Sequence, residues 1–166
     1  KDNFEIMYNN LSTYSNIHTH PYGLGDKNDE LTMYKSNDPD NFAAWSLYPQ
    51  LKNIDESNST IIEIREAKSE INSIGIKGFD LIKIDTEGAE YSIIKSMGSS
   101  FLKKTQLIVG ELHGNYDYEF LSYLNEIGFN IRTNIKANKP HFMFYAISGQ
   151  LLKNMTRKEI RILNQL

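Results

Sequence analysis

Cysteine is absent from this sequence of 166 residues. Disulfide bonds, thiolate zinc sites and cysteine nucleophiles are therefore excluded for this chain. Long apolar runs are also absent, because no stretch approaches the roughly 20 residues that a membrane-spanning helix needs. The N-terminal residues are polar and show no signal peptide. We therefore expect a cytoplasmic protein that has no membrane partner.

An excess of positive charge is absent too. The chain has 18 Lys and Arg against 21 Asp and Glu, for a net charge of -3. A nucleic-acid partner is therefore not expected, since such partners select strongly basic surfaces. The hydrophobic fraction of 40% and the charged fraction of 23% are typical of a globular protein with a real core. The length fits one domain, residues 1–166.

The spacing of apolar residues predicts an alternation of helices and strands. Residues 17–22 are predicted as a strand that a turn over residues 23–26 closes. A polar segment, residues 36–58, is predicted as a long loop that carries an apolar cluster around Trp45. Loops of this length are often functional, so Trp45 either pins the loop to the body or covers a substrate. Helices are predicted at 3–14, 66–74, 87–97, 116–127 and 155–166, and further strands at 30–34, 60–64, 79–84, 106–112, 129–135 and 141–148.

The order of these elements predicts an α/β fold, with helices on the faces of a sheet. Residues 79–84 are almost continuously apolar, which suits a strand buried on both faces in the middle of a parallel sheet. Residues 129–135 and 141–148 both alternate in character and are separated by a short connection. They are therefore predicted to form a C-terminal antiparallel hairpin.

The segment with the clearest chemical content runs from Asp80 to Glu90. A buried strand ends in Asp85, and the helix that follows begins with Glu87 and Glu90. Ligands of open α/β sheets bind beyond the carboxyl ends of the strands, which is where Asp85 stands. Acids in the first turn of a helix are also favoured by the helix dipole, so Glu90 has a purely structural explanation as well.

Glu111 and His113 end the next predicted strand. Residues two apart on a strand point to the same side. If the two strands are neighbours, Glu111 and His113 converge with Asp85 and Glu87 at one edge of the sheet. A lone histidine is most often structural, but one beside such an acid cluster is also a functional candidate.

The sequence Lys-Ile-Asp-Thr-Glu-Gly-Ala-Glu, residues 83–90, resembles the signature of FkbM-type methyltransferases. Three flanking features are similar to that family as well. They are the opening helix with the turn at 22–25, the acidic strand end at 111–113, and the Gly128-Phe129 pair before the hairpin. The resemblance extends over nearly the whole chain.

The resemblance implies a Rossmann-like methyltransferase sheet whose last strand is reversed. It also implies S-adenosylmethionine as the methyl donor and a small-molecule acceptor, often a hydroxyl on a sugar or natural product. Gly23, Leu24 and Asp26 would border the adenine pocket, with Asp85 as a further cofactor contact. Glu87, Glu90 and Trp45 are the residues that we expect to contact the substrate.

The family's glycine-rich motif and its ribose-binding acid are not found in this sequence, which contains no Gly-x-Gly-x-x-Gly. In the family, the strands that carry them lie between the third and fourth strands at the centre of the sheet. We therefore expect this chain by itself to be inactive. We also expect it to self-associate as a homo-oligomer, because open strand edges pair with other strands.

Methyl transfer to a hydroxyl requires a base that takes the proton of the acceptor. His113 is the first candidate, because its ordinary pKa of about 6.5 lies near operating pH. Asp85 and Glu111 are the next candidates. The same two acids could instead bind a divalent cation that polarises the acceptor oxygen. Two other classes of function stay open, a non-catalytic α/β binding or assembly module and a metal-dependent hydrolase.

Overall fold

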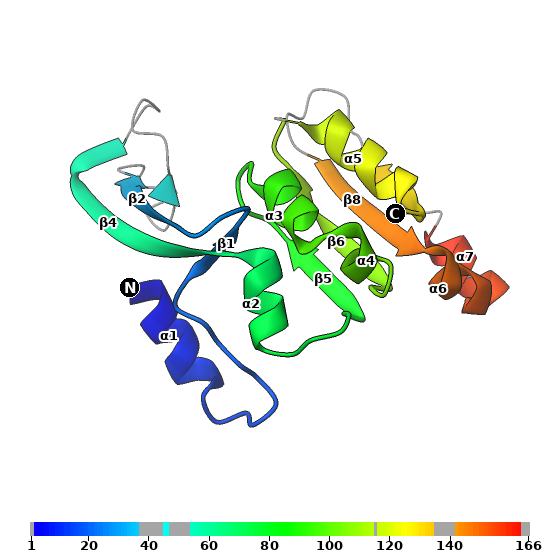
Figure 1. Ribbon diagram of the computed structural model, residues 1–166, viewed down its shortest axis with the longest axis horizontal. Helices are drawn as coiled ribbons and strands as arrows, with labels where there is room; N and C mark the ends of the chain where they lie inside the picture. The colour runs from blue at the N-terminus through cyan, green and yellow to red at the C-terminus, as the bar shows by residue number, and fades with distance from the viewer. Residues whose placement is uncertain (1, 37–44, 47–53, 115, 135–141, 164–166) are drawn as a thin grey trace. The chain divides into compact units, whose positions relative to one another are not determined.

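The computed structural model describes residues 2–36, 45–46, 54–114, 116–134 and 142–163. The chain divides into two compact units, Lys1–Arg65 and Glu66–Leu166. That these units form one domain over residues 1–166 stays a prediction. Each unit has its own sheet (Figure 1).

The first unit is a small antiparallel structure. Its described elements are α1 (Asp2–Leu11), β1 (Gly23–Gly25), β2 (Asp29–Ser36), β3 (Trp45–Ser46) and β4 (Ile54–Glu66). The strands form a four-stranded sheet in the order β1-β4-β2-β3. Strand β2 runs antiparallel to β4, with Asp29 opposite Ile64. Strand β1 packs closely against the side chain of Ile64. A Cβ added at Gly23 would lie 2.7 Å from that side chain, and one added at Gly25 would lie 2.6 Å from it.

The predicted opening helix is confirmed up to Leu11, but the strand predicted at 17–22 is wrong. The strand is Gly23–Gly25, in the segment predicted as a turn. Its glycines let the backbone come close to Ile64, a contact that local apolar spacing does not reveal. Within the predicted loop 36–58, residues 36, 45–46 and 54–58 are strand, and residues 37–44 and 47–53 lie outside the described residues.

The second unit carries a four-stranded sheet in the order β5-β6-β8-β7. Strands β5 and β6 are parallel, and β8 runs antiparallel to both β6 and β7. The condition for the predicted convergence, that the two strands are neighbours, is therefore met, and the predicted C-terminal hairpin is confirmed. Its described elements are α2 (Ala67–Ser73), β5 (Leu81–Ile84), α3 (Glu90–Met97), α4 (Ser99–Leu102), β6 (Leu107–Leu112), α5 (Asp117–Glu126), β7 (Phe129–Asn134), β8 (Phe142–Ser148), α6 (Gly149–Asn154) and α7 (Arg157–Leu163).

Three local predictions in this unit are corrected. Strand β5 is buried on one face only, since Ile84 is 6% exposed whereas Leu81 is 53% exposed. Strand β5 also lies at the end of the described sheet and not in its middle. Helix α3 begins at Glu90 and not at residue 87, because residues 87 and 88 have φ angles of 55° and 109° that no right-handed helix contains. The predicted last helix, 155–166, begins later as α7 at Arg157, because Met155 is extended, and the short helix α6 before it was not predicted.

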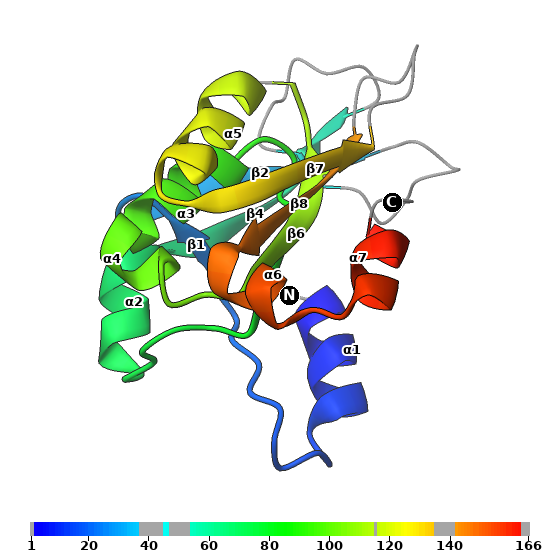
Figure 2. The same cartoon turned by 90° about the vertical axis from the view of Figure 1, so that its right-hand side faces the viewer.

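The core of the second unit lies between its sheet and the helices α3 and α5, which lie on one face (Figure 2). Phe120 on α5 meets Phe144 on β8 edge to face, with their ring centroids 5.1 Å apart. Gly110 on β6 stands between Ile84 and Phe144 in the sheet register. The packing holds the ends of β5 and β6 side by side, and the residues that follow those ends form the candidate site.

Candidate functional site

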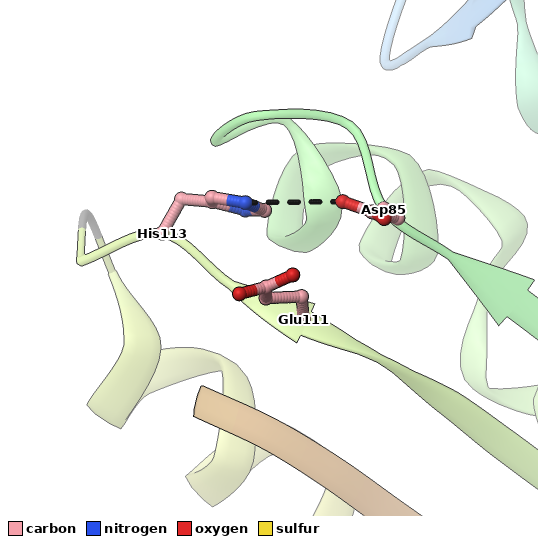
Figure 3. A group of neighbouring side chains, drawn as sticks. All are labelled: Asp85, Glu111 and His113. Carbon is pink, nitrogen blue, oxygen red and sulfur yellow. Dashed lines mark ion pairs between the residues drawn. The ribbon is translucent and has the colours of Figure 1, made fainter. Parts of the chain in front are cut away.

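Asp85 follows β5, and Glu111 and His113 stand at the end of β6 and just beyond it. Figure 3 shows the three side chains converging from the two strand ends. One ligand atom from each of these side chains lies within 4.8 Å of the others. The parallel register brings them together, because Ile84 stands opposite Gly110 and both strands end at the same edge.

The loop between β5 and α3 turns its backbone N–H groups toward a buried acid. Glu87 has a φ of 55° and Gly88 a φ of 109°, so the chain doubles back sharply before α3. The N–H of Thr86 donates to Glu90 Oε1 at 2.9 Å, and the N–H of Gly88 donates to Oε2 at 3.0 Å. The Glu90 carboxyl group therefore stabilises the loop that presents Asp85 and Glu87.

Glu90 also contacts His113, which is 23 residues further along the chain. His113 Nδ1 and Glu90 Oε1 are 2.9 Å apart, a hydrogen-bond distance. The side chain of Glu90 is 4% exposed and that of His113 is 7% exposed. This buried pair connects the first turn of α3 to the end of β6.

The charge state of Glu90 follows from its surroundings. Burial by itself would raise the pKa of the Glu90 carboxyl group. The backbone hydrogen bonds from Thr86, from Glu90 itself and from Gly88, together with the bond from His113, outweigh the burial and hold the pKa below its ordinary value. Glu90 is thus a buried acid that keeps its negative charge at neutral pH.

The other ring nitrogen of His113 faces the exposed acids. His113 Nε2 lies 3.5 Å from Glu87 Oε2 and 3.8 Å from Asp85 Oδ1. The side chain of Glu87 is 79% exposed and that of Asp85 is 40% exposed. Lys83 Nζ approaches Asp85 at 3.9 Å on the side of β5. The accessible part of the site is therefore lined by carboxylates, which suits a positively charged ligand.

The predicted convergence of Asp85, Glu87, Glu111 and His113 is confirmed in geometry. Their catalytic and substrate-binding roles stay predictions. Glu90 was expected to contact the substrate, but its oxygens accept hydrogen bonds from the chain itself and its side chain is almost fully buried.

The predicted cofactor contacts Gly23, Leu24 and Asp26 belong to the first unit, whereas Asp85 belongs to the second. The two glycines of β1 are explained there by their close approach to Ile64. That these three residues bind the cofactor together with Asp85 stays a prediction. Trp45 lies in the short strand β3, and its side chain is outside what the structure describes.

Sequence reasoning missed the hydrogen bonds that shape both loops of the site. It assigned no partner to the N–H groups of Thr86 and Gly88, and none to that of Gly114, which donates to Asp117 Oδ2 at 3.1 Å. The glycines at 88 and 114, both with positive φ, were the available signal that the chain turns sharply at these points.

The histidine and the carboxylates lie at the carboxyl edge of a parallel strand pair, which is where open α/β sheets bind their ligands. Comparison with protein families identifies the family of the chain. The methyltransferase FkbM domain matches residues 2–131, and the chain therefore belongs to the FkbM methyltransferase family, as the resemblance predicted. No curated protein and no solved structure matches the chain. In the part of the chain that the structure describes, none of the helices has the length and apolar character needed to cross a membrane.

Proposed function

We propose that this protein takes part in S-adenosylmethionine-dependent methylation of a hydroxyl group on a small molecule, such as a sugar or a natural product. The observation that carries the proposal is the placement of His113 at the carboxyl edge of the sheet. Its ring is almost fully buried, and its Nε2 is directed toward Asp85 and Glu87. The family assignment supports methyl transfer as the class of reaction.

In this proposal the residues of the chain bind the acceptor and remove its proton. A new bond forms between the acceptor oxygen and the methyl carbon while the carbon–sulfur bond breaks, and the hydroxyl proton must leave. His113 Nε2 accepts that proton, because a neutral imidazole nitrogen is a general base and this one faces the accessible side of the site. Asp85 and Glu111 are the alternative bases.

S-adenosylmethionine, when bound, supplies the methyl group and carries positive charge on its sulfonium and ammonium groups. The carboxylates of Asp85, Glu87 and Glu111 fit such charges, since the site is acidic where it is accessible. The Rossmann-like arrangement, the adenine contacts at Gly23, Leu24 and Asp26, and the cytoplasmic location belong to the same proposal. They rest on the resemblance or on the sequence.

A divalent cation is the second candidate ligand of this site. The ligand atoms of Asp85, Glu111 and His113 lie within 4.8 Å of one another, close enough for one ion to contact all three. Two carboxylates and an imidazole are ligands that Mn²⁺ or Zn²⁺ accepts. An ion bound to His113 Nε2 would prevent that nitrogen from acting as the base, so the two functions of His113 exclude each other. Tight cation binding without a response to the methyl donor would favour the metal-dependent hydrolase.

The test is calorimetric titration of S-adenosylhomocysteine into the protein in its natural full length, and into its Asp85→Asn and His113→Gln variants. We expect the wild-type protein to bind, the Asp85 variant to bind more weakly, and the His113 variant to bind normally but to lose methyl transfer to hydroxylated acceptors. A folded full-length protein that binds no S-adenosylhomocysteine would sink the proposal and favour a non-catalytic assembly module.

Self-association is a separate proposal. Strand β5 ends the described sheet of the second unit, and Leu81 on it is 53% exposed. An open strand edge with an apolar side chain favours pairing with another strand. Sedimentation velocity of the 166-residue chain should show a dimer or a larger species. A monomer at all concentrations would contradict it.

A further inference from the structure

We propose that Glu90 is a positioning residue, which holds His113 with its proton on Nδ1 so that Nε2 is the nitrogen presented to the acceptor. The inference rests on the proposed function, because it assigns the orientation of the base in that reaction. It changes the role of Glu90, which sequence reasoning placed among the substrate contacts.

The hydrogen-bond donors around Glu90 decide where the proton lies. Oε1 accepts from the N–H of Thr86 at 2.9 Å, and Oε2 accepts from the N–H of Gly88 at 3.0 Å. A backbone N–H can only donate, so both oxygens act as acceptors, and such bonds favour the ionised carboxylate by holding the pKa of Glu90 below its ordinary value. The proton in the 2.9 Å contact with His113 therefore belongs to Nδ1.

The ring chemistry of histidine then determines the other nitrogen. A neutral imidazole carries one proton, so a ring that donates from Nδ1 has an acceptor at Nε2. Nε2 lies 3.8 Å from Asp85 Oδ1 and 3.5 Å from Glu87 Oε2, on the accessible side of the site. The buried carboxylate thus fixes the tautomer that can take a proton from an acceptor hydroxyl, and it stabilises the imidazolium that results.

A purely structural role for Glu90 does not require these contacts. An acid in the first turn of a helix interacts with the helix dipole from the surface and needs no partner on another element. Glu90 is 3% exposed and reaches a ring that lies beyond the end of β6. If Glu90 only capped its loop, the tautomer of His113 would not depend on it.

The first measurement needs neither cofactor nor acceptor. Long-range ¹H–¹⁵N spectra of the ¹⁵N-histidine-labelled protein, at a pH of about 8–9 where imidazoles are neutral, report which ring nitrogen is protonated. The His113 signals are assigned by their loss in His113→Gln. We expect Nδ1 to be protonated, and an Nε2-protonated ring in the wild-type protein would overturn the proposal whatever the variants do.

The second measurement, on the full-length protein, compares Glu90→Gln with Glu126→Gln, an exposed acid at the end of α5. The neutral amide keeps the shape of Glu90 but not the charge that stabilises the imidazolium. We expect kcat for Glu90→Gln to fall about tenfold or more, with KM nearly unchanged. Equal kcat values for the two variants would overturn the proposal. Failure of S-adenosylhomocysteine to bind would instead sink the proposed function and leave the tautomer result standing.

Discussion

Replacing Gly110 by alanine should separate the two strands that carry the site. Gly110 stands opposite Ile84 on β5 and Phe144 on β8. A Cβ added there would lie 2.0 Å from the Ile84 carbonyl oxygen and 2.9 Å from Phe144 Cε1. Real Cβ atoms essentially never show contacts under 3.0 Å, so β5 and β6 must move apart by about 1 Å, the difference between 3.0 and 2.0 Å.

The cost of this change follows from overpacking and from the lost strand pairing. Forcing extra atoms into a packed core costs about 1–3 kcal/mol. Each backbone hydrogen bond that the movement breaks between β5 and β6 adds about 1 kcal/mol. We therefore expect Gly110→Ala to lower the free energy of unfolding by about 3 kcal/mol or more. The same shift moves Asp85 away from His113, and a displacement of about 1 Å can reduce catalysis by about 100-fold.

Urea denaturation followed by circular dichroism measures the change in stability, and amide hydrogen exchange of β5 and β6 locates it. The matched control is Gly149→Ala at the start of α6, because an added Cβ there meets nothing within 4 Å. We expect the control to change stability by less than about 0.5 kcal/mol. If Gly110→Ala falls in the same range, the close approach of β5 and β6 is not what holds the site together.

Two other predictions test the second unit. Phe120→Ala should cost about 3–5 kcal/mol in urea denaturation, because this side chain is fully buried against Phe144, and a loss below about 1 kcal/mol would contradict that packing. The side-chain and backbone hydrogen bonds from Thr156 hold the pKa of Glu159 below its ordinary value of 4.5. The Glu159 carboxylate therefore stabilises the start of α7 fully at any pH above 4.5. This stabilisation is lost as the pH falls through the pKa that Glu159 has in the folded protein. Amide exchange in α7 should therefore accelerate at acidic pH in the wild-type protein but not in Glu159→Gln.

Much of the second unit could be predicted from sequence, because its helices and strands have strong local periods. The alternation over residues 141–148 and the apolar run before Asp85 are local patterns, and both became strands. The first unit was less predictable. Its strand β1 forms where glycines let the backbone lie against Ile64, which is about forty residues away in sequence, and short-range spacing carries no information on such a contact.

Part of the candidate site could likewise be predicted from the sequence, and part could not. The sequence by itself determined that Asp85, Glu111 and His113 stand at strand ends, because strand ends and the two-residue period are local properties. The tertiary structure decided that the two strands are parallel neighbours. Only the tertiary structure decided that Glu90 turns inward and meets His113. That contact depends on the positive φ angles at residues 87 and 88 and on the close packing of β5 against β6, which together bring two residues 23 positions apart within hydrogen-bond distance.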